Sequence, residues 1–311
     1  MDNEIVVTIR CLVYNHEPFL RQCLDGFVMQ KTNFRFEAIV HDDASTDGSA
    51  DIIREYASKF PDIIKPIIET ENQYSKKDGS LTRIMNEHSR GKYIASCEGD
   101  DCWIDPYKLQ KQVDILENNK EFGCVFTAYQ TINVNGELCD FQPSIRNMNR
   151  SFSGDVFYEL LKANFPQTLT VVYQKELLSN NFNPPYLLDY SLFLSLAIQK
   201  KFYYLPEVTG YYRINPAGLV QTGELGRIYD FTSIQIYYFV EYLKNKQYKR
   251  AKIEDKRIKK LLLTEWCHVW MMLKYYKYFM KIVRYYPLSL ILIPLCLFRR
   301  MIKSDLFKIK Y

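Results

Sequence analysis

The chain has 311 residues, 47% of them hydrophobic and 25% charged, with a formal net charge of +5. This length and composition exclude a disordered chain and suit one large domain, or a domain with an appendage. No basic leader precedes an apolar segment at the start, and no apolar run reaches the ~20 residues of a membrane-spanning helix, so we expect a cytoplasmic protein. Eight cysteines without a Cys-x-x-Cys pair or a Cys/His cluster favour reduced, mostly buried thiols over disulfides or zinc.

The first third of the chain alternates between strand and helix patterns. The apolar run Ile5–Val13 predicts a parallel strand buried on both faces, and from Pro18 apolar residues recur every three to four positions, which predicts a helix. A second strand is predicted at residues 36–40, and Ser49 or Asp51 can cap the helix after it. The remaining elements of this part are a strand at 63–68, a helix at 81–89 and a strand at 93–97. This order predicts an α/β fold with a mostly parallel sheet and right-handed crossovers.

The rest of the chain is less regular. Its expected elements are helices at 108–119, from Ser153 to near Lys162 and from Asp189, strands at 124–134, 168–173, 202–205 and 208–213, and helical periodicity from residue 224 onward.

Polar segments follow three of the predicted strands at their carboxyl ends. They are residues 14–17, 41–47 and 98–101. In open α/β sheets ligands bind at this edge of the sheet. We therefore expect the three segments to lie together and to form the binding site.

Carboxylates cluster in the last of these segments. Glu98, Asp100 and Asp101 repel one another and are costly away from water, so the cluster needs a cation, a basic ligand or open solvent. Hard cations such as Mg²⁺ prefer carboxylate oxygens and keep positions for phosphate oxygens. Asp100 and Asp101 thus suit a metal that bridges to a diphosphate, and a solvated loop with helix-capping aspartates is the alternative.

Three common site motifs are absent from the sequence. No Gly-x-Gly-x-x-Gly follows the first strand, no Gly-x-x-x-x-Gly-Lys-Ser/Thr occurs, and no Gly-x-Ser-x-Gly occurs. These absences disfavour dinucleotide binding, a P-loop and a Ser/His/Asp hydrolase.

Five segments stand out together between about residues 5 and 215. In chain order they are VTIRCLVYNHEPFL, FEAIVHDDASTDGS, GKYIASCEGDDCWIDPYKLQKQ, LLDYSLFLSLA and VTGYYRIN. Together they resemble the family 2 glycosyltransferases of bacterial surface polysaccharide synthesis, the enzymes of capsule and lipopolysaccharide, which have the GT-A fold. The resemblance implies a GT-A domain at residues 1–223, with a nucleotide-binding half at 1–105 and an acceptor half at 106–223.

The resemblance also implies roles for single residues. In the nucleotide-binding half they are Tyr14 and Glu17 beside the base, Asp43 with Asp42 on the polar edge of the base, Arg83 near the diphosphate, Asp100 at the ribose and the metal, and Asp101 as the usual ligand of Mn²⁺ or Mg²⁺. In the acceptor half they are Asp189 as the general base and Arg213 near the diphosphate. Leu188 precedes Asp189, where many members of the family carry Glu.

The implied reaction is an inverting transfer from a nucleotide-diphosphate sugar, with a UDP-sugar as the expected donor. The acceptor is a hydroxyl of a glycan or of a polyprenyl-diphosphate-linked molecule, and Asp189 takes its proton while a divalent cation and Arg83 or Arg213 stabilise the leaving diphosphate. The alternatives are a sugar-nucleotide pyrophosphorylase, a glycosidase, which uses a pair of carboxyl groups and no nucleotide, and a non-catalytic, membrane-bound scaffold with a transferase-like fold. No nucleic acid is expected as a partner, and a homo-oligomer is compatible with the sequence.

The tail differs from the rest of the chain in charge. Residues 240–311 contain 18 Lys/Arg and 5 Asp/Glu, a net charge of +13, whereas the residues before them carry −8. Leu288–Phe298 is apolar but too short to span a bilayer, and Arg299 and Arg300 follow it. We expect residues 224–311 to form a helical tail that holds the protein on the anionic inner face of the plasma membrane. Packing on the rest of the chain and a homo-oligomer interface are the alternatives.

Overall fold

The structure is a computed structural model that describes residues 4–76, 78–139, 153–178, 189–215, 234–235 and 238. The chain divides into two compact units. The first comprises Met1–Val156, Phe165–Asn183 and Gln199–Gly218, and the second comprises Phe157–Asn164, Pro184–Ile198 and Leu219–Tyr311. The boundary expected at residue 223 and nearly all of the expected tail lie outside the described residues.

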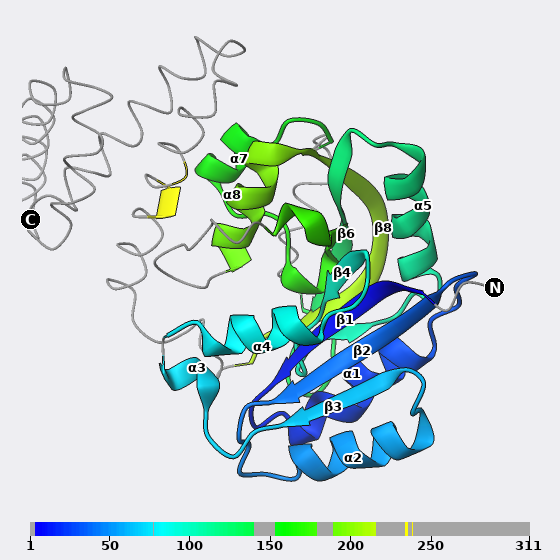
Figure 1. Ribbon diagram of the computed structural model, residues 1–311, viewed down its shortest axis with the longest axis vertical. Coiled ribbons are helices and arrows are strands. Elements are labelled where there is room, and N and C mark those ends of the chain that lie inside the picture. The colour runs from blue at the N-terminus through cyan, green and yellow to red at the C-terminus, as the bar shows by residue number, and fades with distance from the viewer. Residues whose placement is uncertain are drawn as a thin grey trace, which may run out of the picture. The chain divides into compact units, whose positions relative to one another are not determined.

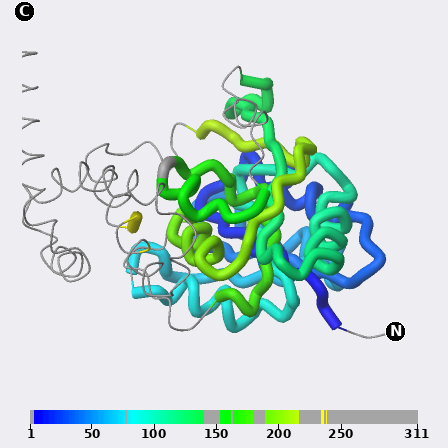
Figure 2. The backbone as a smooth tube through the Cα atoms, turned by 90° about the horizontal axis from the view of Figure 1, so that it is seen from above, coloured from blue at the N-terminus to red at the C-terminus, as the bar shows by residue number. Residues whose placement is uncertain are grey.

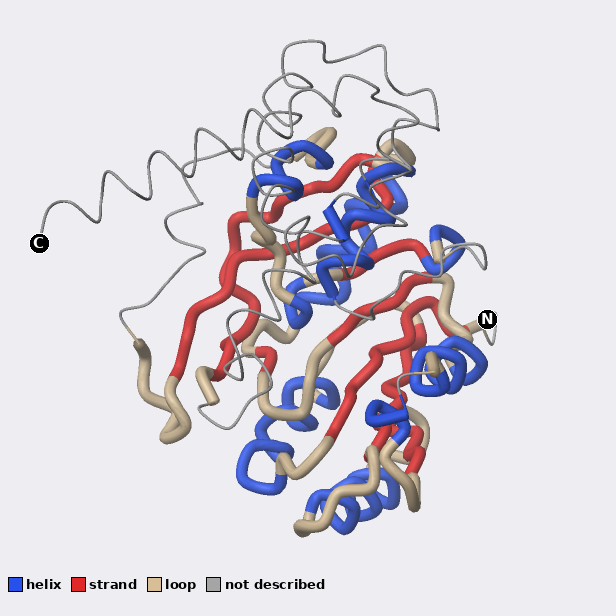
Figure 3. The backbone as a smooth tube through the Cα atoms, turned by 90° about the vertical axis from the view of Figure 1, so that its left-hand side faces the viewer, coloured by secondary structure: helices blue, strands red, loops and turns tan. Residues whose placement is uncertain are grey.

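A sheet forms the centre of the first unit, and Figure 3 shows its strands as one continuous twisted layer. Within the described residues the strand order is β3-β2-β1-β4-β7-β6-β8-β5. The strands are β1 (Ile5–Val13), β2 (Arg35–Asp42), β3 (Ile64–Ile68), β4 (Tyr93–Ser96), β5 (Cys102–Trp103), β6 (Phe122–Ile132), β7 (Val172–Gln174) and β8 (Lys201–Arg213). Only β7 and β5 run antiparallel to their neighbours, so the predicted α/β fold with a mostly parallel sheet is confirmed.

Helices cover both faces of the strands β1 to β3 (Figure 1). They are α1 (Glu17–Val28), α2 (Ser49–Lys59), α3 (Gln73–Lys76) and α4 (Ser80–His88), and α5 (Lys108–Asn118) follows β5 in the chain. Successive residues of a strand point to opposite faces. Val40 therefore packs in the core cluster that includes Ile53 of α2, while its neighbour Ile39 packs against Leu81 and Met85 of α4. Burial on both faces explains the continuous apolar runs of these strands.

Several details of the fold differ from the sequence prediction. Neither Ser49 nor Asp51 caps α2, because the helix begins at Ser49 and the Oδ1 atom of Asp47 accepts the Ser49 N–H at 3.0 Å. Ser153 caps no helix either. Its hydroxyl oxygen accepts the backbone N–H of Tyr204 at 2.9 Å, and helix α7 begins later, at Phe157.

The third difference is that the two strands expected at 202–205 and 208–213 are one strand, β8, which runs beside β6 (Figure 2). The register jumps from the pair Thr127 and Leu205 to the pair Ala128 and Val208. This irregularity accommodates Pro206, which has no N–H to donate to the ladder. The strand expected at 168–173 begins as a 3₁₀ turn at Thr168–Thr170.

In the second unit the described residues comprise mainly α7 (Phe157–Lys162) and α8 (Asp189–Gln199), of which Gln199 belongs to the first unit. The Tyr190 hydroxyl donates to the Leu160 carbonyl oxygen at 2.7 Å, which ties the two helices together. The helix expected from Asp189 is confirmed. No helix among the described residues is both long enough and apolar enough to span a membrane.

The described cysteines are free thiols. Cys11, Cys23, Cys97, Cys102 and Cys124 are buried, while Cys139 is partly exposed. For these residues the expectation that the thiols are mostly buried is confirmed, and their reduced state stays a prediction.

Candidate functional site

The loops that follow β1, β2 and β4 meet at one edge of the sheet, as predicted. Val13 at the end of β1 pairs with Asp42 at the end of β2, and the Val13 carbonyl oxygen accepts the N–H of Asp43 at 2.9 Å. On the other side of β1, the Leu12 carbonyl oxygen accepts the N–H of Gly99 at 3.0 Å. The carboxyl ends of these parallel strands thus bring the three polar segments together.

Side chains join the loop after β1 to the loop after β2. The Oδ1 atom of Asn15 accepts the N–H of Thr46 at 2.8 Å, and a carboxylate oxygen of Glu17 accepts the N–H of Gly48 at 2.8 Å. A Cβ atom at Gly48 would lie 2.7 Å from Cδ of Glu17, so a larger residue there would displace the Glu17 carboxylate from this contact. Glu17 therefore serves the fold, and its contact with a base stays a prediction. Tyr14, by contrast, is 49% exposed and its ring is available to a ligand.

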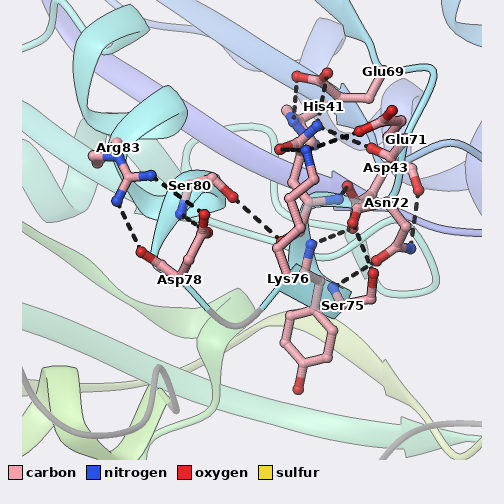
Figure 4. Close-up of polar contacts among 12 residues, drawn as sticks. His41, Asp43, Glu69, Glu71, Asn72, Ser75, Lys76, Asp78, Ser80 and Arg83 are labelled. Atoms are coloured by element: carbon pink, nitrogen blue, oxygen red, sulfur yellow. Dashed lines mark hydrogen bonds and ion pairs between the residues drawn. The ribbon is translucent and has the colours of Figure 1, made fainter.

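Asp42 and Asp43 are both buried but differ in their partners. The two carboxylate oxygens of Asp43 accept the backbone N–H groups of Gln73 at 2.6 Å and Tyr74 at 3.0 Å, which holds the short helix α3 at the end of β2 (Figure 4). The Oδ2 atom of Asp42 accepts the N–H of Ser45 at 3.1 Å, whereas its buried Oδ1 atom has no hydrogen-bond partner among the described residues. Of the carboxylate oxygens in this pair, Asp42 Oδ1 is thus the one without a hydrogen bond in the described chain, and it can accept one from a ligand.

Asp100 and Asp101 lie in the turn after β4. Asp101 is 5% exposed, and its Oδ1 atom accepts the N–H of Arg213 at 2.8 Å. The carbonyl oxygen of Asp100 accepts Nε–H of the same arginine at 2.9 Å. Burial and then the charge of Asp100 raise the pKa of Asp101 well above its usual range. The fold therefore holds two adjacent carboxyl groups at the edge where the loops meet.

Arg213, the last residue of β8, is buried and engaged at each of its three side-chain nitrogens. Besides the bond to Asp100, its Nη1 donates to the Asn133 carbonyl oxygen at 3.0 Å and its Nη2 donates to Oε1 of Gln22 at 2.6 Å. Its guanidinium also lies 4.5 Å from the centre of the Phe19 ring. These contacts show that Arg213 holds the turn that contains Asp100. Its contact with a diphosphate stays a prediction.

Arg83 on α4 has an exposed side chain. Its Nη1 donates to the Asp78 carbonyl oxygen at 2.8 Å, and its Nη2 lies 3.8 Å from the Asp78 carboxylate. Figure 4 shows Arg83 turned toward Asp78 and Ser80, apart from the group around Asp43. Asp189 begins α8 in the second unit, so its distance from the carboxylates of the first unit is not defined and its role stays a prediction.

The sequence prediction assigned no role to His16, which the structure places beside the carboxylates. Its Nε2 atom is 3.8 Å from Oδ2 of Asp100, and its Nδ1 atom is buried beside Gly99 without a hydrogen-bond partner in the described part of the chain. Burial lowers the pKa of His16, although the nearby negative charges of Asp100, Asp47 and Asp42 act to raise it. Its position in the loop after the first strand, two residues beyond Tyr14, was the available signal.

The pair Asp100 and Asp101 can be tested as ligands for a divalent cation. Among the described residues no Lys or Arg side chain forms an ion pair with either carboxylate, and no group of three or more His, Cys, Asp or Glu is placed to hold a metal. Two adjacent carboxyl groups, both oxygen donors and one of them, Asp101, with a raised pKa, fit a hard cation that takes its other ligands from phosphate and water. They do not form a complete metal cage.

The likeness to solved structures gives the fold. The crystal structure of S. aureus TarS residues 1–349 in complex with UDP-GlcNAc has a TM-score of 0.59 at 14% identity, covering 85% of this chain and 81% of that chain. The mannosyltransferase PcManGT from Pyrobaculum calidifontis, in complex with GDP-Man and Mn²⁺, has a TM-score of 0.59 at 17% identity, covering 84% and 70%. The fold is that of the GT-A glycosyltransferases, as predicted.

Sequence comparison gives the family. The profile of "Glycosyl transferase family 2" matches residues 9–180, more than half of the chain, and the chain belongs to this family. An uncharacterized protein of Mycobacterium tuberculosis (strain ATCC 25618 / H37Rv) is 35% identical over 217 residues, which are 68% of this chain and 60% of that protein. The chain thus spans less than two thirds of the length of this relative.

Proposed function

We propose that this chain transfers a sugar from a nucleotide-diphosphate sugar, in particular a UDP-sugar, to a hydroxyl of a glycan or lipid-linked acceptor, with inversion at the anomeric carbon. Membership of the family and the bound nucleotides of the two similar structures support the donor class. The resemblance of the five sequence segments supports a place in the synthesis of a bacterial surface polysaccharide.

One observation carries the proposal. Asp100 and Asp101 stand together at the carboxyl edge of a parallel sheet. Arg213 holds the Asp101 carboxylate through its backbone N–H and the Asp100 carbonyl oxygen through its side chain, and forms no ion pair with either carboxylate. Holding two carboxylates side by side, with Asp101 buried, costs free energy, and this cost appears as the raised pKa of Asp101. A cation that binds there together with a diphosphate offsets that cost, which is a reason for a protein to keep the pair.

In the proposed reaction the residues of the chain have distinct tasks. The cation would supply positive charge to the leaving diphosphate, with Asp101 and Asp100 as its ligands and Asp100 also toward the ribose. Tyr14 lies against the base, with Asp42 and Asp43 at its polar edge, and the exposed guanidinium of Arg83 turns from Asp78 to the diphosphate.

On the acceptor side, Asp189 accepts the proton of the attacking hydroxyl. An aspartate with an ordinary pKa near ~4 is ionised at cellular pH and needs no special surroundings for this task. Arg213 is a positioning residue in this scheme, since each of its side-chain nitrogens already donates to a protein oxygen.

Two rivals remain and differ in their chemistry. A sugar-nucleotide pyrophosphorylase needs a glycine-rich loop after the first strand, where this chain has Tyr14-Asn15-His16-Glu17. A non-catalytic scaffold binds the nucleotide sugar in the presence of metal but turns over no acceptor. Slow, Mn²⁺-dependent hydrolysis in a screen of nucleotide sugars favours the transferase and identifies the donor.

The test of the donor site is calorimetry of UDP binding with Mn²⁺ and with EDTA. We expect EDTA to weaken binding to the wild-type chain at least tenfold, about 1.4 kcal/mol. Asp101→Ala should bind weakly under both conditions, because it lacks the ligand that the cation needs. Asp114→Ala, on the exposed side of α5, is the matched control and should behave as wild type. Equal affinity of the wild-type chain with Mn²⁺ and with EDTA contradicts the proposal.

A further inference from the structure

Lys108, the first residue of α5, is a lysine with no exposed surface. Its Nζ atom donates to Oε1 of Gln112 at 2.6 Å and lies 4.4 Å from the centre of the Trp103 ring. Among the described residues no carboxylate lies within ion-pair distance of it. Burying an ammonium group without a counter-charge is costly, so the sequence would be expected to avoid it unless the group has a task.

The partners of Lys108 are themselves fixed. The amide nitrogen of Gln112 donates to the carbonyl oxygens of Val125 at 3.0 Å and Thr170 at 2.8 Å. Gln112 is thereby tied to β6 and to the turn before β7. The ammonium of Lys108 thus sits between a rigid acceptor and the face of an aromatic ring, which is attractive to a cation.

Trp103 links this buried charge to the proposed donor site. It lies two residues after Asp101 in the strand β5, which has only two residues and pairs with Gly210 and Tyr211 of β8. The same strand β8 ends at Arg213, whose N–H binds the carboxylate of Asp101. The register of β5 against β8 therefore decides whether Asp101 and Arg213 meet.

A ladder of two residues cannot secure this register by itself, so side-chain contacts must do so. Trp103 supplies these contacts. Its indole N–H donates to the Leu169 carbonyl oxygen at 2.8 Å, and its ring packs edge-on against the Phe27 ring, with 5.0 Å between the ring centres. Gly26 allows close packing, since a Cβ atom there would lie 2.9 Å from the backbone nitrogen and oxygen of Trp103. Lys108 adds a further contact, on the face of the ring.

We propose that Lys108 is a positioning residue whose buried ammonium, seated on Trp103, holds β5 in the register that joins Asp101 to Arg213. It acts on the donor site through Trp103 and touches no substrate. Other groups that act on its charge are Asp105, in the turn before α5, and the thiols of Cys97 at the end of β4 and Cys124 in β6. The effect on nucleotide affinity rests on the proposed function, whereas the effect on the register of β5 does not.

The experiment compares the whole chain with its Lys108→Met variant, which keeps most of the length of the side chain and removes the charge. Both measurements are made at about pH 6, below the folded pKa of Lys108, so that its amino group is protonated. Hydrogen exchange over residues 98–104 is measured without nucleotide, and calorimetry then measures UDP binding with Mn²⁺. We expect about tenfold faster exchange at residues 98–104 and about tenfold weaker UDP binding, at an unchanged or higher thermal midpoint, because a buried charge has been removed. Lys120→Met, exposed just after α5, is the matched control and should change neither quantity.

The outcomes separate the two proposals. Unchanged exchange at residues 98–104 in Lys108→Met overturns the positioning role, as does faster exchange throughout the chain with a lower thermal midpoint. If the wild-type chain binds no UDP with Mn²⁺, the proposed function fails and the exchange result still decides the role of Lys108.

A second variant covers the case that Lys108→Met does not fold. Trp103→Phe weakens the attraction of the ring for the cation and also removes the hydrogen bond to Leu169, so it should increase local exchange by at least as much as Lys108→Met. If both variants fold, their effects on exchange should be less than additive in the double variant, since both act on one contact. Full additivity would mean that Lys108 does not act through Trp103.

Discussion

Neighbouring aspartates in this protein have different surroundings, and the difference decides what each can do. Asp43 gives both carboxylate oxygens to the backbone of α3, while Asp42 keeps one buried oxygen without a partner in the described chain. An oxygen that already accepts a backbone N–H stabilises the fold, whereas one without a partner is costly until a ligand donates to it. Both residues are aspartates in the same sequence motif, so only the structure shows that their carboxylates have different partners.

At the residue scale, the proposed base is tested by Asp189→Asn. The substitution keeps the size of the side chain but removes a proton acceptor, so we expect UDP-sugar binding within about twofold of wild type and transfer lowered by roughly 10²–10⁴. Calorimetry and initial rates with the same donor measure the two effects. Loss of donor binding in proportion to the loss of activity would assign Asp189 to the donor site or to the fold instead.

Lys108 makes stability depend on pH. Burial lowers its pKa from 10.5 to about 7, so between these values the unfolded chain binds a proton that the folded chain does not. The free energy of unfolding of the wild-type chain therefore rises with pH across this range, by up to about 1.4 kcal/mol per pH unit. Lys108→Met removes this contribution and should be more stable than wild type near pH 6, with a difference that shrinks from pH 7 to 10. Denaturant unfolding of both proteins measures it, and parallel pH profiles would contradict it.

At the scale of elements, the helix α3 depends on one side chain of another element. It has four residues, too few to be stable by itself, and Asp43 accepts two of its first N–H groups. Figure 4 shows this part of the chain gathered around Asp43.

We expect Asp43→Ala to free α3. Hydrogen exchange at residues 72–76 should become about fivefold faster or more, since the loss of a cap costs about 1 kcal/mol or more. UDP affinity should also fall, because the same residue is proposed at the base. Asp51→Ala, at an exposed position in α2, is the control and should leave exchange at residues 72–76 unchanged. Lower UDP affinity without faster exchange would mean that Asp43 serves the nucleotide and that α3 is held by other contacts.

The sequence predicted the regular elements well where their apolar pattern is continuous. Strand β1 has the bounds expected from its apolar run, and α4 and α5 differ from their predicted ranges by a single residue at their ends. The errors lie where contacts with distant segments of the chain decide how an element begins or ends. Ser49 is the first residue of α2 and does not cap it. Asp47 accepts the N–H of Ser49 with one oxygen and the N–H of Glu17 with the other, which is a contact between two loops.

At the scale of the whole molecule, the tail stays a prediction, because residues 240–311 lie outside the described residues. Their charge of +13 favours an anionic membrane surface. We expect the full chain to co-sediment with liposomes more strongly as their anionic lipid content rises and less strongly as salt is added.

The charge of the tail can be tested by substitution. Arg299→Glu with Arg300→Glu should weaken co-sedimentation with anionic liposomes about tenfold or more, since each basic residue near the surface contributes about 1 kcal/mol. Lys120→Glu, a single exposed change in the first unit, should have a smaller effect. If the double substitution has no effect, or if partitioning does not respond to anionic lipid, the tail has another task, such as packing on the rest of the chain or on a second copy.

The sequence by itself determined the fold class, the family and the edge of the sheet where the site lies. It did so because apolar periodicity reports local burial, and because the carboxyl ends of parallel strands meet whatever the loops contain. Only the tertiary structure decided that Arg213 holds Asp100 and Asp101, that Asp43 caps α3, and that a lysine lies buried on Trp103. These contacts join residues far apart in the chain, and the type of a residue does not reveal which partner will meet its polar atoms when the chain folds.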